Sequence, residues 1–107
     1  MADFNSRRET FERKFAHDEA LRFKAIARRN KLFGVWAARQ LGKSEADVEA
    51  YANTVVVADF DEPGDDDVIR KVAVDLDKAG VAVHEGDLRR VLEGFIDRAI
   101  QEVKGGP

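Results

Sequence analysis

Residues 88–103 read LRRVLEGFIDRAIQEV and carry the clearest helical pattern in the chain. Their apolar side chains recur at the three- and four-residue spacing that places them on one face of an α-helix. These side chains are Leu88, Val91, Leu92, Phe95, Ile96, Ala99, Ile100 and Val103. The pattern predicts an amphipathic helix that His84 introduces and that Gly105 and Gly106 end. A helix of this kind needs other apolar faces to pack against.

A second amphipathic helix is predicted immediately upstream. Residues 65–67 are three aspartates, which supply an N-cap and negative charge for the first turn of a helix. Gly80 ends this helix, and residues 59–67, with Pro63 and Gly64, form a turn before it. Its apolar positions are Val68, Val72, Leu76 and Ala79.

Residues 45–60 allow two interpretations. Ser44 followed by Asp47 resembles a capping box, and Val48, Tyr51 and Val55 have helical spacing. Residues 53–60, with three consecutive valines, also resemble a buried strand. No second β-branched run exists for such a strand to pair with, so the helix is the consistent prediction.

Residues 3–41 lack proline and contain only one glycine, Gly34, so this segment allows one long helix or two consecutive ones. Gly42 is expected to end this segment. Asn30 projects into the apolar stripe and must be hydrogen-bonded there, and Trp36 is expected at the core. The stripe consists of Phe4, Phe11, Phe15, Ile26, Phe33 and Ala37, with Phe23 and Leu41 on its flank.

Arg8, Glu12 and Arg22 interrupt this stripe, so its first turns lack the apolar anchors of a core helix. We therefore expect an all-α protein, a four-helix bundle with a mobile or partly helical N-terminal arm. The predicted organisation is an arm at residues 1–18, a globular domain at 19–104 and a tail at 105–107. The length of 107 residues suits a single domain.

Composition and charge limit the classes of function. The chain has no cysteine and no apolar stretch long enough to span a bilayer, so a cytosolic protein is expected. The net charge of −3 is unevenly divided. Residues 1–43 carry eleven Lys and Arg against five Asp and Glu, whereas residues 44–107 carry seven against sixteen. The basic half, with its phenylalanine-containing arm, fits a protein partner or, as the alternative, a nucleic acid.

No catalytic or metal-binding motif appears in the sequence, so no enzymatic activity is expected. The acidic turn fails as a calcium loop, because Pro63 and Arg70 occupy positions 5 and 12. His17 and His84 have no second histidine at metal-binding spacing. Arg28, Arg29 and Lys31 have two interpretations: solvated or paired with the acidic half, or binding a phosphate group.

Two motifs resemble the zeta-subunit ATPase inhibitors of alphaproteobacterial F-type ATP synthases. The first runs from Phe15 through FAHDE, FKA, ARRNKL and WAA to Leu41 and Gly42, and the second is DFDEPGD at residues 59–65. The likeness covers about residues 4–76. It implies a four-helix globule whose N-terminal segment enters a catalytic interface of the ATP synthase head and blocks ATP hydrolysis.

The resemblance also implies which residues bind the partner. On this sequence the inhibitory segment comprises Phe4, Arg7, Arg8, Glu9, Phe11, Glu12, Arg13, Lys14 and Phe15. Such a protein is cytoplasmic, peripheral to the inner membrane through the ATP synthase, and is expected to be monomeric when free. The resemblance also implies weak adenine-nucleotide binding by the globule, although the motif match does not assign its residues. Arg28, Arg29 and Lys31, selected above as phosphate-binding candidates, are the candidate nucleotide-binding residues, and neither a resident cofactor nor a nucleic acid is expected.

Overall fold

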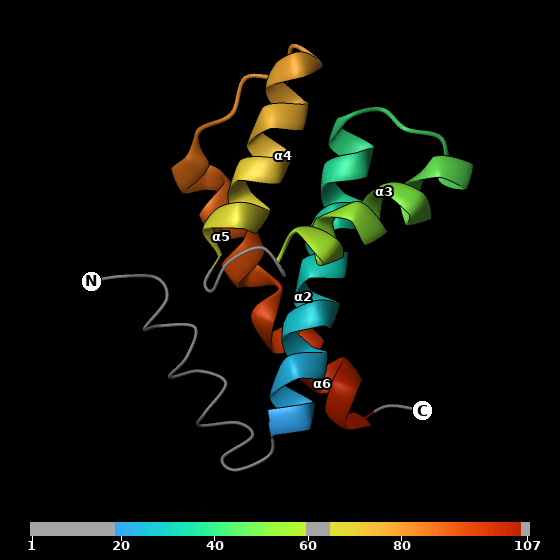
Figure 1. Ribbon diagram of the computed structural model, residues 1–107, viewed down its shortest axis with the longest axis vertical. Helices are drawn as coiled ribbons and strands as arrows, with labels where there is room; N and C mark the ends of the chain where they lie inside the picture. Colours follow the sequence, from blue (N-terminus) through green and yellow to red (C-terminus); the bar gives the residue numbers. More distant parts are fainter. Residues whose placement is uncertain (1–18, 60–64, 106–107) are drawn as a thin grey trace.

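The computed structural model describes residues 19–59 and 65–105, and every regular element in this part of the chain is a helix. The all-α prediction is confirmed. Figure 1 shows the helices assembled around α2, the longest of them. They are α2 (Glu19–Gln40), α3 (Glu45–Ala58), α4 (Asp66–Lys78), α5 (Glu85–Gly94) and α6 (Ile96–Gly105). The predicted arm at residues 1–18 lies outside the described residues.

Two predicted glycine stops are confirmed, at the ends of α2 and α4. Gly42 and Gly80 have φ angles of 75° and 78°, in the left-handed region that glycine adopts without steric cost. The backbone N–H of Lys43 donates to the carbonyl of Ala38, and that of Val81 donates to the carbonyl of Leu76. Both helices therefore end in the Schellman arrangement, in which the carbonyls of the last turn are satisfied.

The predicted N-caps occupy the expected positions but make different bonds. Ser44 and Asp65 precede α3 and α4, yet neither side chain caps a backbone N–H. The Ser44 hydroxyl instead donates to Asp47 at 3.2 Å, and the Asp65 carboxylate accepts from Arg29. The predicted N-cap positions are therefore confirmed, and each side chain bonds a polar side chain in place of a backbone N–H.

The last predicted helix is divided at Phe95 into α5 and α6, so the uninterrupted helix predicted over residues 88–103 needs correction. The Phe95 N–H bonds the Leu92 carbonyl, three residues back, where a regular α-helix would bond four residues back. Gly94, a weak helix former, directly precedes this break. Since one residue separates α5 from α6, they act as one bent helix, and the described chain has the predicted four-helix architecture. His84 is the N-cap of α5, as predicted.

The most extensive contact between two helices is that of α2 with α3, and it includes a close approach of their backbones. A Cβ added at Gly34 would lie 2.8 Å from the Ala52 Cα, closer than side chains tolerate. The glycine therefore lets the two backbones approach. α3 extends through Val55, Val56 and Val57 to Ala58, so the alternative strand at residues 53–60 is excluded as far as residue 59.

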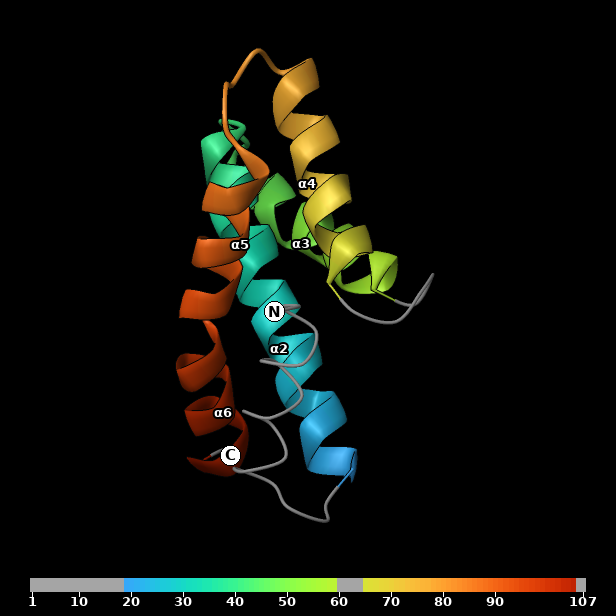
Figure 2. The same cartoon turned by 90° about the vertical axis from the view of Figure 1, so that its left-hand side faces the viewer.

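Apolar side chains form two separate clusters. The main cluster joins the C-terminal half of α2 to α3, α4 and α5 and contains Phe33, Val55, Val72, Leu76 and Leu92 among others. The second, the α2–α6 cluster, contains Ala25, Ile96 and Ile100, with Leu21, Ile26 and Val103 partly buried beside them. Figure 2 shows α6 continuing below α5 along the first turns of α2.

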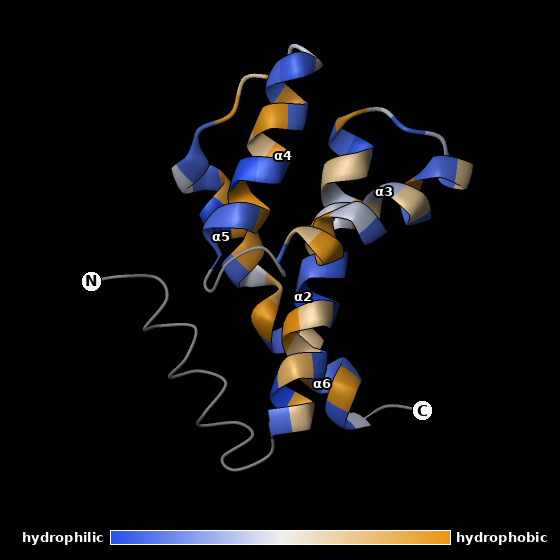
Figure 3. Cartoon of the chain, viewed as in Figure 1, coloured by the Kyte–Doolittle hydropathy of each residue, from blue (hydrophilic) through white to orange (hydrophobic). Residues whose placement is uncertain are grey.

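Hydropathy alternates along the helices, as amphipathic helices require, and Figure 3 shows this as orange and blue bands on α4 and α5. Trp36, expected at the core, is partly buried against the main cluster, and its ring stacks on Phe33 with centroids 5.8 Å apart. Within residues 19–59 and 65–105, no helix combines the length and the apolar character that a membrane crossing requires.

Candidate functional site

The excess of basic residues lies in α2 and at Lys43, and not in the N-terminal arm. Residues 1–18 carry four Lys and Arg against four Asp and Glu. Residues 19–43 carry seven Lys and Arg against a single acid, Glu19. The basic residues of this part are Arg22, Lys24, Arg28, Arg29, Lys31, Arg39 and Lys43.

The candidate phosphate-binding residues Arg28, Arg29 and Lys31 point to three different environments. The Arg29 side chain is fully buried, and its guanidinium donates to both carboxylate oxygens of Asp65 at 2.8 and 3.3 Å. It also donates to the Asn30 side-chain oxygen at 2.8 Å. Arg29 thus connects the middle of α2 to the start of α4, and it is not accessible to a ligand in this arrangement.

Asn30 satisfies one sequence prediction through the same contacts. Its side chain is 1% exposed, and its oxygen accepts two hydrogen bonds from Arg29, while its buried amide nitrogen has no hydrogen-bond partner among the described residues. The bidentate contact between the guanidinium and Asp65 compensates both charges for the loss of water. This buried polar group is Arg29, Asn30 and Asp65, and it lies between the two apolar clusters along α2.

Arg28 and Lys31 remain near the surface and contact acidic residues on two other helices. Arg28 forms an ion pair with Glu102 of α6 at 3.5 Å, and Lys31 forms one with Glu49 of α3 at 2.8 Å. Both side chains border an open groove between α2, α3 and α6, which we call the α2–α6 groove. Two of the three candidate residues therefore share one surface, and the third does not.

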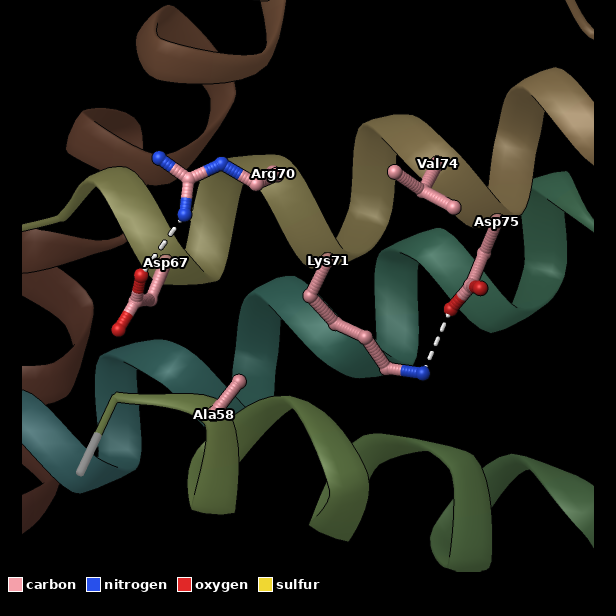
Figure 4. Close-up of a pocket in the computed structure, with 6 residues that line it drawn as sticks. All are labelled: Ala58, Asp67, Arg70, Lys71, Val74 and Asp75. Carbon is pink, nitrogen blue, oxygen red and sulfur yellow. Dashed lines mark hydrogen bonds and ion pairs between the residues drawn. The ribbon is translucent and has the colours of Figure 1, made fainter. Parts of the chain in front are cut away.

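A second surface hollow lies between α3 and α4 and is shown in Figure 4. It measures about 390 Å³, and its charged groups pair with one another. Arg70 contacts Asp67 at 3.0 Å, and Lys71 contacts Asp75 at 2.8 Å. Because each cation has a carboxylate beside it, the hollow offers no net charge to a ligand. Its lining consists of Ala58, Asp67, Arg70, Lys71, Val74 and Asp75.

Tyr51 and Asp75 form the most strongly perturbed titratable pair near this hollow. The Tyr51 hydroxyl donates to Asp75 at 2.8 Å, and burial, together with this bond and the adjacent negative charge, raises the Tyr51 pKa. Burial alone would raise the Asp75 pKa, but hydrogen bonds from Lys71 and Tyr51 and the charges of Lys71 and Lys78 lower it. The pair is thus held in its un-ionised tyrosine and ionised aspartate forms, which suits a structural role.

Acidic and histidine residues do not gather into a metal site in the described part of the chain. The predicted partner-binding residues of the arm, from Phe4 to Phe15, lie outside the described residues. The family comparison bears directly on them, because a model of the ATPase inhibitor subunit zeta matches residues 1–102. The chain belongs to the ATPase inhibitor subunit zeta family.

A solved structure supports the same fold for this zeta-family chain. An NMR solution structure is 46% identical to it, covering 79% of this chain and 96% of that one, with a TM-score of 0.71. No curated protein matches the chain. The zeta family match spans the arm and nearly all of the helices, so the resemblance inferred from the two sequence motifs is confirmed.

Sequence reasoning on this zeta-family chain missed part of the α2–α6 groove. Phe23 and Lys24 of α2 and Lys104 of α6 line it beside Arg28 and Lys31. The available signal was the position of Phe23 on the flank of the apolar stripe, where a large side chain is only partly covered. The α6 residues of the groove could not be found from the apolar stripe of α2, because their position depends on the break between α5 and α6 at Phe95.

Proposed function

We propose that this chain inhibits ATP hydrolysis by F-type ATP synthase, with residues 1–18 entering a catalytic interface of the synthase head. The observation that carries the proposal is the extent of the family match, which begins at residue 1 and so includes the arm. The chain acts by binding and not by catalysing a reaction. Its location is then peripheral to the membrane, through the synthase.

The composition of the arm suits insertion between two protein surfaces. Phe4, Phe11 and Phe15 fall on one face at helical spacing and provide apolar anchors. Its four basic and four acidic side chains balance, so they pair with partner groups of either sign and add little long-range attraction. The charged candidates for these contacts are Arg7, Arg8, Glu9, Glu12, Arg13 and Lys14.

Adenine-nucleotide binding is a weaker component of the proposal. Arg28 and Lys31 are its candidate residues, because Arg29 is buried against Asp65. The ion pairs of Arg28 and Lys31 with Glu102 and Glu49 would compete with phosphate, so weak affinity is expected. The same pairing disfavours the nucleic-acid alternative, since Arg28 and Lys31 already face carboxylates.

Deletion of residues 2–14 tests the inhibitory role of the arm. The shortened chain should lose inhibition of ATP hydrolysis by the purified synthase head while keeping its helical circular dichroism and melting transition. A matched pair of point variants refines the test: Phe11→Ser in the arm should weaken inhibition, whereas Val83→Ser, at an exposed position after α4, should not. ATP hydrolysis and ATP synthesis are measured separately to establish the direction that is blocked.

Two results would contradict the proposal. Full inhibition by the deletion variant would show that the arm is not the inhibitory element. Absence of inhibition by the intact chain, at concentrations far above that of the synthase head, would show that the head is not its target.

A further inference from the structure

The α2–α6 groove is an open hollow on the described surface. Its volume is about 700 Å³, and side chains of α2, α3 and α6 line it. Phe23 is 60% exposed at its edge, a large apolar area for a residue of a small protein. The apolar part of the lining comprises Phe23, Ala27, Val56 and Val103.

Positive charge borders this apolar floor. Lys24, Arg28, Lys31 and Lys104 line the groove, and Glu102 is the single acidic residue among its lining residues. Glu102 contacts Arg28, and it also accepts a hydrogen bond from Arg98 at 2.9 Å. Lys24 is the one cation of α2 that forms no ion pair with the described residues. Arg28 and Lys31 pair with Glu102 and Glu49, so the groove presents the ammonium of Lys24 beside exposed apolar surface.

We propose that the α2–α6 groove binds an acidic, amphipathic segment on the surface of the ATP synthase head, as a second contact beside the arm. This inference rests on the proposed function. The apolar floor receives the apolar side chains of the segment, and a carboxylate of the segment pairs with Lys24.

Continuity with the arm favours this partner. Phe23 and Lys24 lie about one helical turn after Glu19, the first residue of α2, so an arm inserted in the head brings the groove against the head surface. The arm and the groove then bind the head at the same time. Because only a few residues connect them, binding of one raises the effective concentration of the other at its site.

Charge also favours the synthase head over the chain's own arm as the occupant of the α2–α6 groove. The arm carries four basic and four acidic residues, so a cationic border gains little from binding it. The Lys24 ammonium, which forms no ion pair with the described residues, is available to a carboxylate of an acidic partner. In this division of roles, the groove steers association and the arm inhibits.

A double variant, Phe23→Ser with Lys24→Glu, tests the groove in the full-length chain. Its affinity for the purified synthase head should fall by about tenfold or more, while inhibition at saturation stays complete. The wild-type affinity should also weaken steeply with added salt, and the variant should show a smaller salt dependence. The control is Val83→Ser with Lys78→Glu, a matched change at the far end of α4 (Figure 1), which should bind like the wild type.

A photo-crosslinking variant, Phe23→p-benzoylphenylalanine, gives a second measurement that does not depend on affinity. Crosslinks should map to a segment of the head with more Asp and Glu than Lys and Arg. Crosslinks confined to residues 1–18 of the same chain, or tighter head binding by the groove variant, would identify the arm as the occupant and overturn the proposal. Loss of MgADP binding by the groove variant, with unchanged head binding, would overturn the proposal in favour of a nucleotide.

The two levels of inference fail in different ways. If the wild-type chain neither binds nor inhibits the head, the proposed function fails and the groove proposal fails with it. If the wild-type chain binds and inhibits, but the groove variant and the control bind equally well, only the groove proposal is overturned.

Discussion

The two ends of α2 are supported very differently. Its C-terminal half packs against α3, α4 and α5 in the main cluster, where Phe33, Leu76 and Leu92 have 1% exposure or less. Its N-terminal half packs against α6, where the buried cluster is Ala25, Ile96 and Ile100 and Ala99 is also buried. Among the described residues, this half of α2 therefore belongs to the smaller of the two apolar clusters. Segments with little burial open most readily, and binding surfaces are commonly drawn from them.

The buried polar group Arg29, Asn30 and Asp65 lies at the boundary between these regions, and its disruption should give the largest effect. Arg29→Met leaves the Asp65 carboxylate buried without its guanidinium, which should cost about 3–5 kcal/mol of unfolding free energy in urea titrations. Arg90→Met is the control, because Arg90 is exposed and pairs with Asp87 within α5, a contact worth about 1 kcal/mol or less.

A companion variant separates loss of charge compensation from loss of packing. Arg29→Met combined with Asp65→Leu removes both charges and should recover most of the lost stability. Equal costs for Arg29→Met and Arg90→Met would show that burial does not strengthen the Arg29–Asp65 contact.

Removal of a buried aliphatic side chain from the main cluster should have the next largest effect. Leu76 is fully buried, so Leu76→Ala should cost about 3 kcal/mol and lower the stability of the whole domain. Urea unfolding followed by tryptophan fluorescence reports it, since Trp36 packs against the same cluster. A loss below about 1 kcal/mol would indicate that this region repacks around the cavity.

The matched change in the α2–α6 cluster should be smaller and more local. Ile100 is 3% exposed and similar in size to Leu76, but fewer buried neighbours surround it. Ile100→Ala should therefore cost about 2 kcal/mol, the lower end of the range for such changes. Amide hydrogen exchange should accelerate in α6 and the first turns of α2 while α4 stays protected. Uniform acceleration through α4 would show that the two clusters unfold as one unit.

The comparison also shows which features the sequence could predict. Helix identity and the glycine stops follow from local patterns, and Gly42 and Gly80 end helices where the sequence places them. The burial of Arg29 could not be derived, because its partner Asp65 lies 36 residues away and looked like an ordinary N-cap. Asn30 was recognisable because its helical phase alone places it in the apolar stripe.

The groove was only partly predictable for a related physical reason. Arg28 and Lys31 could be selected from the sequence as surface cations of α2. The placement of Glu102, Val103 and Lys104 beside them depends on the break between α5 and α6. An unbroken pattern of apolar residues over 88–103 conceals that break, because hydrophobic periodicity reports the buried face and not the helix axis.

The smallest predicted loss of unfolding free energy comes from removing the Tyr51–Asp75 hydrogen bond. This change affects only the part of the molecule that contains the main cluster. Tyr51→Phe keeps the ring, over which the Lys43 and Lys71 amines lie at 5.4 and 5.3 Å, and removes the hydroxyl that donates to Asp75. The cost at neutral pH should be about 1 kcal/mol, because Asp75 keeps its contact with Lys71. Hydrogen exchange in α6 should be unchanged, which sets this variant apart from Ile100→Ala.

The difference in unfolding free energy between wild type and Tyr51→Phe should depend on pH, and this dependence identifies the Tyr51 hydroxyl as the source of the difference. Folding raises the Tyr51 pKa, so the stabilisation is complete below the ordinary tyrosine value of about 10 and is lost as the pH rises above it. The stability gap between wild type and Tyr51→Phe should therefore narrow between about pH 10 and 11, while titrating lysines common to both proteins cancel. Folding lowers the Asp75 pKa, so its contribution is lost in both proteins only as the pH falls below about 4. A gap that stays constant across the alkaline range would mean that the phenol ionises equally well in the folded chain, contrary to its buried position against Asp75.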